Sequence, residues 1–508
     1  MSGNAAARRE ARVRRMMRTF LNVGFRILLT VNATMVVMPR SVAEESTSPS
    51  AGDVEARIQR VEAGLQPAVA IAGEPAMKLA DRMNDLHVPG VSIALIHDGA
   101  IQWARGFGVA AVGGPPVTPD TLFQAGSISK PVSAVAALAL VQAGKLDLDT
   151  DVNLFLKSWK VPANSYTAKS NVTLRELLNH SAGTTVHGFA GYQAGAVVPS
   201  LAEVLNGAPP ANNDPIVVDH RPGARFRYSG GGYTIMQQML LDVTGRDFPS
   251  LLDDTVLRPF GMTHSSFLQP LPVGETSAAT PYLADGAPVP GGPHIYPELA
   301  AAGLWTTPTD LAHFALALLD AWRGRANPVL SQSMASQMLT PGLGDYGLGP
   351  VVSGSPPNRR FSHGGVDEGF VSFMVAYETG DGAVVMTNGE RGGDLAGEIM
   401  RSIAAEYHWP NGQAVLRKRT TVDPKLLDRF VGNYQLSPRF FIQISREGDH
   451  LFSQATGQGK YEIFPESDRD FFLTEVDVVI TFETDGQADA TRLILHQDGT
   501  DHPARRVR

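Results

Sequence analysis

The strongest constraint on the fold is a stretch that is apolar on every side when it is wound into a helix. Residues 131–141 read Pro-Val-Ser-Ala-Val-Ala-Ala-Leu-Ala-Leu-Val. A helix that is apolar all round is buried, so this stretch predicts a helix at the centre of a domain. Pro131 is tolerable because it falls close to the helix start, and Gly144 is a good C-cap.

Ser127 and Lys130 stand just before this helix, three positions apart, which places both side chains on one helical face. Serine is a poor nucleophile at neutral pH and needs a neighbouring base. A lysine serves as that base only where burial lowers its pKa. The mouth of a buried helix offers such a setting, and backbone N–H groups at a helix N-terminus stabilise an anion. Because Ser-x-x-Lys occurs by chance in most long chains, the assignment depends on the rest of the sequence.

The composition limits the classes of protein that the chain can belong to. Its 508 residues are too many for one ordinary core and favour two domains plus a processed N-terminus. Hydrophobic residues make up 43% and charged residues 19%, as in globular proteins, and a net charge of −8 gives no support for nucleic-acid binding. The absence of cysteine excludes disulfides, thiolate metal sites, cysteine catalysis and a lipid-modified N-terminal cysteine.

Residues 1–43 have the order of an export signal: a basic stretch, an apolar run and a small-x-small ending at Ser41 and Ala43. The apolar run, residues 27–38, is short for a membrane span. We therefore expect an exported protein, periplasmic or secreted, whose mature chain has no stable membrane span. An uncleaved N-terminal anchor is the alternative.

The basic part of this segment is long, so Met16 or Met17 is an alternative start of the protein. Residues 44–53 are polar and are expected to be a disordered linker.

Residues 54–410 are predicted to form an α+β domain, an antiparallel sheet flanked by helices with an all-helical subdomain. Hydrophobic periodicity and turn signals carry this prediction. Strands are expected at 91–96, 101–109, 371–377 and 383–388, and helices at 54–86, 172–180, 234–243 and 395–407. Residues 184–220, rich in small and turn-forming residues, are expected to be a long loop of the kind that shapes a binding site.

After a linker at residues 411–422, the pattern changes to short alternating strands broken by turns. The clearest strands are expected at 440–444, 476–482 and 492–496. Short strands at this spacing predict a small all-β barrel or sandwich over residues 423–508.

Two further motifs follow Ser127 in chain order. Tyr228 precedes three glycines, residues 230–232, which allow close backbone approach and unusual dihedral angles. His363, Gly364 and Gly365 come just before the strand expected at 371–377.

Ser127-x-x-Lys130, Tyr228-x-Gly230 and His363-Gly-Gly365 in this order resemble the serine β-lactamase-like superfamily. That group includes class C β-lactamases, D-peptide-cleaving penicillin-binding proteins, D-aminopeptidases and related carboxylesterases. The resemblance covers about residues 54–408, and the segment from 423 resembles the lipocalin-like C-terminal domain of some of these hydrolases.

The resemblance implies that Ser127 attacks an acyl carbonyl while Lys130 and Tyr228 relay its proton. It implies that Tyr228 then activates water, acting as a base if a charged Lys130 nearby lowers its pKa. The backbone N–H groups of Ser127 and Val366 would form the oxyanion hole.

His363 takes the place of the lysine in the Lys-Thr-Gly motif, and Gly364 and Gly365 would let the substrate lie along the strand edge. No metal or organic cofactor is implied.

The sequence departs from the β-lactamase pattern at two positions. Tyr-x-Asn ends here in Gly230, which removes an amide, and His363 is mostly neutral at pH 7, which removes a fixed positive charge. Lowering the pH toward 6 is expected to restore that charge in part. Both changes favour an ester over a β-lactam, and they leave a D-peptide or β-lactam substrate and a catalytically silent peptidoglycan-binding protein as alternatives.

The order of the N-terminal segment predicts signal cleavage after Ala43. We expect N-terminal sequencing of the protein from its native host to begin at Glu44. A mature chain that still begins at Met1 or Met16 would refute cleavage.

Overall fold

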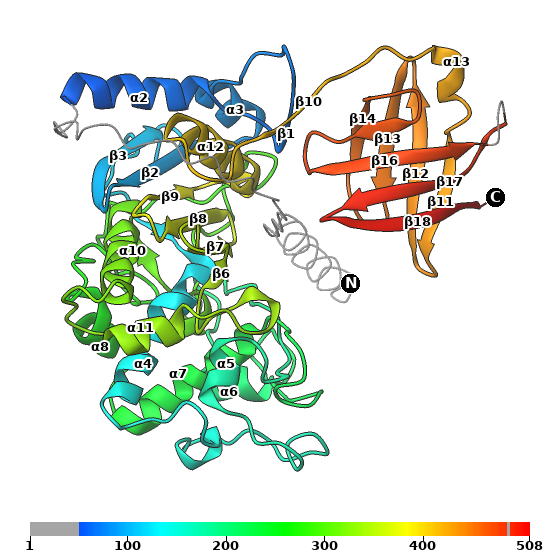
Figure 1. The fold of residues 1–508 in the computed structure, drawn as a ribbon. Helices are drawn as coiled ribbons and strands as arrows, with labels where there is room; N and C mark the ends of the chain where they lie inside the picture. The colour runs from blue at the N-terminus through cyan, green and yellow to red at the C-terminus, as the bar shows by residue number, and fades with distance from the viewer. Residues whose placement is uncertain (1–49, 485–487, 508) are drawn as a thin grey trace, which may run out of the picture. The chain divides into compact units, whose positions relative to one another are not determined.

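The computed structural model describes residues 50–484 and 488–507, which form two compact units. One unit comprises residues 80–396, and the other joins residues 50–79 to residues 397–507. Figure 1 shows the elements of both units, each of which is described by itself below. The predicted export signal and residues 44–49 of the expected linker lie outside the described residues. No helix in the described ranges has both the length and the apolar character needed to cross a bilayer.

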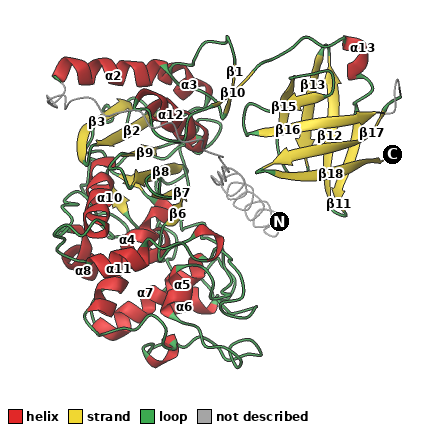
Figure 2. Ribbon diagram, viewed as in Figure 1, coloured by secondary structure: helices red, strands yellow, loops and turns green. Residues whose placement is uncertain are grey.

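A six-stranded sheet with the order β3-β2-β9-β8-β7-β6 forms the centre of the unit 80–396. Every neighbouring pair is antiparallel. The pairing of β2 with β9, in which Val91 lies opposite Thr387, confirms that early and late strands share one sheet. The strands, yellow in Figure 2, are β3 (Ala100–Gly108), β2 (Gly90–His97), β9 (Gly382–Thr387), β8 (Phe370–Tyr377), β7 (Arg360–Asp367) and β6 (Val351–Ser353).

The apolar stretch at residues 131–141 forms most of α4 (Ser129–Gln142), and it is buried as expected. Eleven of its residues are buried, including Lys130, and its side chains belong to the main hydrophobic core of the chain. The other α-helices that precede β6 in the chain, apart from α2, are α3 (Leu79–Asp85), α5 (Leu174–Leu178), α6 (Leu201–Asn206), α7 (Gly230–Thr244), α8 (Phe248–Leu252), α9 (Leu299–Ala302), α10 (Pro308–Trp322) and α11 (Gln332–Met338).

The three glycines at 230–232 lie inside α7 and not in a loop before it, so the expected unusual dihedral angles are wrong. Their role is close approach. A Cβ at Gly231 would lie 2.7 Å from the carbonyl oxygen of Thr185, and one at Gly230 would lie 2.9 Å from the ring of Phe189. The glycines therefore let the first turn of α7 pack against residues 184–189.

The helix expected over 54–86 is interrupted. It begins at Ala51, capped by Ser50, and ends at Ala63. Strand β1 (Val69–Ile71) and α3 follow, since glycine and proline at positions 64 and 67 end the first helix. The helix expected over 172–180 is also shorter, because α5 ends where His180 adopts a left-handed φ of 61°.

The other unit contains α2 (Ala51–Ala63), the short parallel pair of β1 with β10 (Val415–Arg417), and an eight-stranded closed barrel. The barrel follows helix α13 (Pro424–Leu427) and confirms the predicted all-β domain. Its strands are β11 (Gly432–Ser437), β12 (Phe440–Glu447), β13 (His450–Ala455), β14 (Lys460–Pro465), β15 (Asp470–Phe472), β16 (Val478–Thr484), β17 (Ala490–Gln497) and β18 (Thr500–Val507). Helix α12 (Gly392–Glu406) spans the boundary between the units in sequence.

The inside of the barrel is an aromatic core. Phe430 stacks on Phe482 with ring centres 4.4 Å apart, and Phe471 meets Phe482 edge to face at 5.6 Å. These rings and Tyr434 are each 2% exposed or less. The interior side chains thus serve packing, which is what holds a small domain together.

Candidate active site

Ser127 lies in a 3₁₀ turn, Gly126–Ile128, that leads into α4. Ser129 fixes this turn, because its hydroxyl donates to the carbonyl of Gly126 at 2.6 Å and accepts from the N–H of Leu304 at 3.0 Å. Gly126 has a φ of 52°, a conformation that favours glycine. Ser127 is partly exposed while both of its neighbours are buried. The turn therefore presents the serine hydroxyl at the surface of a rigid core.

Lys130 lies directly behind the serine. Its Nζ is 2.9 Å from Ser127 Oγ and 2.9 Å from the carbonyl oxygen of Ala301. The side chain is 2% exposed. Burial lowers the pKa of Lys130 to about 7, and the nearby Asp367 opposes part of that shift. At neutral pH a large share of Lys130 is thus the free amine, whose lone pair can take the Ser127 proton.

Tyr228 completes the group around the nucleophile. Its ring centre lies 5.0 Å from Lys130 Nζ, and an interaction with the Ser127 side chain stabilises its ionised form. Although the residue is partly exposed, burial of its hydroxyl dominates and raises the pKa of Tyr228. The condition under which Tyr228 would act as a base, a pKa lowered by Lys130, is therefore not met. Tyr228 carries its proton at neutral pH and acts as a hydrogen-bond donor.

A cluster of aromatic rings surrounds Tyr228. Its ring centre lies 4.2 Å from that of His180, 4.9 Å from that of His187 and 6.0 Å from that of Tyr346. Burial lowers the pKa of His180 well below its usual range and that of His187 to about 4, so both imidazoles are neutral. The cluster keeps water and positive charge away from the Ser127–Lys130 pair.

His363 lies on β7, 6.4 Å between ring centres from Tyr228. It is 3% exposed, and its Nδ1 lies 2.7 Å from the carbonyl oxygen of Gly364. Burial, with the charge of Lys130, lowers the pKa of His363 to about 3. The residue is neutral, as its place in the sequence predicted. The expected return of its charge near pH 6 is wrong, because burial holds the pKa far below that value.

The edge of β7 approaches the nucleophile turn through backbone atoms. A Cβ at Gly365 would lie 1.8 Å from the carbonyl oxygen of Ala125, and a Cβ at Gly126 would lie 2.4 Å from the backbone N of Val366. The hydroxyl of Ser372 on β8 donates to the same Ala125 carbonyl at 2.8 Å. Strand β6 pairs with β7 only over Arg360–Ser362 in the described structure, so residues 364–366 keep an edge available to a substrate.

The fold thus brings together the residues that the sequence predicted for the site, with a difference in role at Tyr228, described above, and another at Gly230. Gly230 packs under Phe189, and its backbone N–H donates to the carbonyl of His187 at 3.0 Å, so this position supplies space and no polar side chain. Sequence reasoning missed the carbonyl of Ala301 as the second partner of Lys130. It also missed Tyr346 and the buried acids Glu298 and Asp367. The sequence carried no signal for the role of Ala301, since a backbone carbonyl leaves no mark on residue type.

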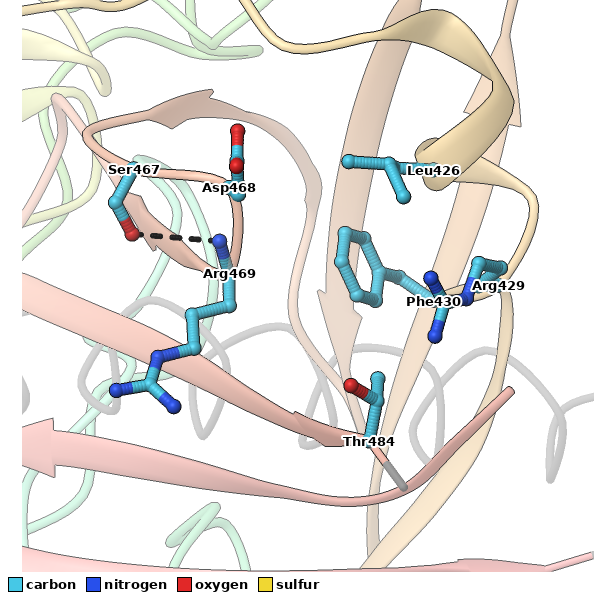
Figure 3. Close-up of a pocket in the computed structure, with 7 residues that line it drawn as sticks. All are labelled: Leu426, Arg429, Phe430, Ser467, Asp468, Arg469 and Thr484. Carbon is cyan, nitrogen blue, oxygen red and sulfur yellow. Dashed lines mark hydrogen bonds between the residues drawn. The ribbon is translucent and has the colours of Figure 1, made fainter. Parts of the chain in front are cut away.

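Neither of two other polar groupings has comparable chemistry. A cavity of about 400 Å³ at the barrel contains Ser467, but its hydroxyl is committed to Asp470 Oδ2 at 2.7 Å and to a turn N–H at 3.3 Å. The lining residues, drawn in Figure 3, are Leu426, Arg429, Phe430, Ser467, Asp468, Arg469 and Thr484.

His97, Asp98 and Asp381 have potential metal-ligand atoms within 4.8 Å of one another. His97 and Asp381 already form a hydrogen bond of 2.7 Å, and Asp98 is exposed in the turn between β2 and β3. The grouping is accounted for by turn structure.

The pairing of a half-exposed serine with a buried lysine on this sheet-and-helix fold defines a serine hydrolase of the β-lactamase type. The family model described as "Beta-lactamase" matches residues 76–406, and a domain of unknown function (DUF3471) matches residues 416–505. The chain belongs to the beta-lactamase family and is a serine hydrolase of that family.

Among curated relatives, penicillin-binding protein 4* of Bacillus subtilis (strain 168) is 24% identical over 85% of this chain and 98% of that protein. Unguisins hydrolase ungD' of Aspergillus campestris is 29% identical over 48% of this chain and 46% of its own length.

Solved structures share the fold. The octameric penicillin-binding protein homologue from Pyrococcus abyssi is 22% identical, with a TM-score of 0.59, over 84% of this chain and 98% of that chain. D-amino acid amidase from Ochrobactrum anthropi is 22% identical, with a TM-score of 0.53, over 70% and 99%. At these identities the likeness concerns the fold.

The low pKa of Lys130 gives a test of its protonation state. Since the base must be the free amine, activity is lost as the pH falls through the pKa of Lys130 and rises as the pH passes above it. We expect kcat/KM for a neutral ester to increase with pH through a limb centred near 7. The measurement is a pH profile of kcat/KM for p-nitrophenyl butyrate. A profile flat from about pH 5 to 8 would contradict an active-site amine with this pKa.

Proposed function

We propose that the protein is an exported hydrolase that cleaves a carboxylic ester or amide through an acyl-enzyme on Ser127. The observation that supports this best is the 2.9 Å contact between the partly exposed Ser127 hydroxyl and the buried amine of Lys130. A serine hydroxyl needs a base at hydrogen-bond distance, and a base works best with a pKa near the working pH.

Acylation begins when Ser127 Oγ attacks the carbonyl carbon and its proton passes to Lys130 Nζ. The tetrahedral intermediate then collapses with cleavage of the bond to the leaving group. That group takes a proton from the active site, either from the Lys130 ammonium directly or through the Tyr228 hydroxyl. The amine of Lys130 is restored, and the acyl group remains on Ser127.

In deacylation water is the nucleophile and Ser127 is the leaving group. Water attacks the acyl carbon, its proton passes to Lys130, and Ser127 leaves as the alcohol after reprotonation. Lys130 is a better base than Tyr228 for this step, because burial lowers the pKa of the amine and raises that of the phenol. Tyr228 orients the reacting oxygen by donating a hydrogen bond.

The backbone N–H groups of Ser127 and Val366 are the proposed oxyanion hole. The backbone N of Val366 on β7 lies close to Gly126, the residue before Ser127, and this proximity supports the assignment. Preorganised N–H donors stabilise the charge that develops on the carbonyl oxygen and are worth several kcal/mol in such sites.

The same residues favour an ester over a β-lactam. A β-lactam carries a carboxylate, and His363 is held uncharged by burial with its Nδ1 committed to a backbone carbonyl. Gly230 offers no amide, and Phe189 takes the space beside it. An ester requires only the nucleophile, the base and the oxyanion hole.

D-peptides and β-lactams remain the alternative substrates. The names of two similar proteins, a penicillin-binding protein and a D-amino acid amidase, favour this alternative. A silent peptidoglycan-binding protein would have no need for a desolvated lysine against a serine hydroxyl, and the intact pair argues against it.

Export to the periplasm or to the medium is part of the proposal. Its support is the basic, apolar and small-x-small order of residues 1–43.

Replacing the nucleophile tests the proposed chemistry. Ser127→Ala should lower kcat/KM for p-nitrophenyl butyrate by about a thousandfold or more, because removal of a catalytic nucleophile leaves only residual catalysis. Ser133→Ala is a matched control, since Ser133 is a buried serine of α4, the helix that follows Ser127, and its hydroxyl has no hydrogen-bond partner among the described residues. Full activity in a folded, purified Ser127→Ala protein would refute the mechanism. Loss of activity in both variants would indicate that the substitutions disturb the fold.

Adding a charge at His363 tests the substrate preference. The wild type should hydrolyse p-nitrophenyl butyrate with a higher kcat/KM than nitrocefin, and His363→Lys should raise the nitrocefin value. A charge-assisted hydrogen bond is worth about 1.5–3 kcal/mol, which corresponds to roughly tenfold to a hundredfold. His363→Gln is the uncharged control, and lowering the pH from about 7 to 6 should give the wild type no gain. Efficient nitrocefin turnover by the wild type, unimproved by lysine, would show that charge does not limit this site.

A further inference from the structure

His180 has an uncommon backbone conformation just after α5. Its φ is 61°, in the left-handed region that residues other than glycine seldom adopt and that asparagine, aspartate and histidine tolerate best. The residue is 2% exposed, so this conformation lies in the interior and not in a surface turn. Backbone strain of this kind persists only where the surrounding structure imposes it, and it is concentrated at functional sites.

His180 holds the chain on both sides of Tyr228. Its backbone carbonyl accepts the N–H of Arg227 at 2.8 Å, and its Nδ1 accepts the N–H of Ser229 at 3.1 Å. The second bond fixes the peptide group that joins Tyr228 to Ser229. A single residue thus binds both chain neighbours of Tyr228, one through its backbone and the other through its ring.

The ring of His180 also packs against the ring of Tyr228, with centres 4.2 Å apart and planes inclined by 34°. The ring centres of Tyr233 and Tyr346 lie 5.4 Å and 4.9 Å from that of His180. Tyr233 is itself fixed, because its hydroxyl donates to the carbonyl of Leu178 at 2.8 Å. The packing of these rings therefore restrains the imidazole in its contact with Ser229.

The bond with Ser229 determines the tautomer of His180. Nδ1 must present a lone pair to accept the N–H of Ser229, so the proton of the neutral imidazole lies on Nε2. An imidazolium carries a proton on both nitrogens and would lose this bond. Burial lowers the pKa of His180 well below its usual range, and the charge of Lys130 acts in the same direction, so the neutral form is maintained.

A second residue with a left-handed backbone holds the chain just after Tyr228. Val186 has a φ of 60°, which is exceptional for a β-branched residue. Its carbonyl oxygen accepts the N–H of Gly231 at 3.1 Å and the hydroxyl of Ser229 at 3.2 Å. The segment 180–186 therefore holds the chain before and after Tyr228, with backbone strain at both of its ends.

We infer that His180 is a positioning residue, which aims the hydroxyl of Tyr228 at Ser127 by holding the N–H of Ser229 with its Nδ1. The ring centre of Tyr228 lies 5.0 Å from Lys130 Nζ, and its hydroxyl interacts with the Ser127 side chain. A reacting group that is displaced by a small distance loses much of its contribution to the rate. This inference rests on the proposed function, in which Tyr228 donates a hydrogen bond to the reacting oxygen.

Two amide variants separate the acceptor at Nδ1 from the bulk of the ring. His180→Asn places a carbonyl oxygen close to the position of Nδ1 and tolerates the left-handed φ, so it should keep the bond with Ser229. His180→Gln carries the same amide one bond further from the backbone and leaves the buried N–H of Ser229 without its acceptor.

The measurement is single-turnover release of p-nitrophenolate from p-nitrophenyl butyrate by an excess of the full chain. We expect the acylation rate constant at saturation to fall by about tenfold to a hundredfold in His180→Gln and to stay within about threefold of the wild type in His180→Asn. This rate constant does not depend on the fraction of folded enzyme, so a role in stability alone would leave it unchanged.

Phe226→Leu is the matched control. The ring centre of Phe226 lies 6.0 Å from that of His180 and 5.0 Å from that of Tyr346, so the substitution loosens the same aromatic cluster. It keeps the acceptor of Ser229, and its acylation rate constant should match the wild type.

If His180→Gln does not fold, the wild-type tautomer provides the test. NMR of the imidazole nitrogens should show a bare Nδ1 and a protonated Nε2 for His180, whose signals are identified by their loss in His180→Asn.

A wild-type rate constant in His180→Gln, an equal loss in the two amide variants, an equal loss in Phe226→Leu, or the opposite tautomer would each overturn the role of His180. Any of these results together with loss of activity in Ser127→Ala would refute this inference alone. Retained activity in Ser127→Ala would refute the proposed function itself.

Discussion

The burial of Lys130 is the constraint on which the site depends. An amine in water is an ammonium ion at neutral pH and cannot act as a base. Burial of Lys130 in the first turn of α4 brings its pKa to about 7, and the 2.9 Å contact with Ser127 places the amine where it can take the serine proton. The apolar character of α4 is therefore a chemical requirement as well as a packing one, since a polar face would admit water to the lysine.

The surrounding elements hold this pair at the surface of a rigid core. The hydrogen bonds of Ser129 fix the turn below the nucleophile, and Ala301 fixes the lysine from the other side. Glycine is needed at 126 and 365 because two backbone segments meet there without room for a side chain. These positions place the edge of β7 beside Ser127, where the proposed mechanism needs a strand and N–H groups for the substrate carbonyl.

Burial also leaves the three histidines of this site without positive charge. The same desolvation that frees the amine of Lys130 keeps His180, His187 and His363 uncharged, so the walls carry no fixed cation where the β-lactamase pattern places a lysine. The aromatic rings around Tyr228 extend this apolar environment. A single physical effect thus lowers the pKa of the base, raises that of the phenol and removes charge from the strand edge.

The sequence by itself determined the main elements and the candidate site residues: the apolar helix after Ser127, the shared antiparallel sheet, the C-terminal barrel and the three motifs. These follow from local patterns, since hydrophobic periodicity indicates which residues are buried and glycine indicates where two backbone segments approach closely. Tertiary structure decided the helix boundaries, the packing of the glycines and the protonation states, which local patterns do not determine. The helix expected to reach residue 86 ends at Ala63, and the glycines after Tyr228 pack inside α7. The protonation of Tyr228 and His363, the carbonyl of Ala301 and the acids Glu298 and Asp367 depend on which distant segments exclude water from each group, and that exclusion exists only in the folded chain.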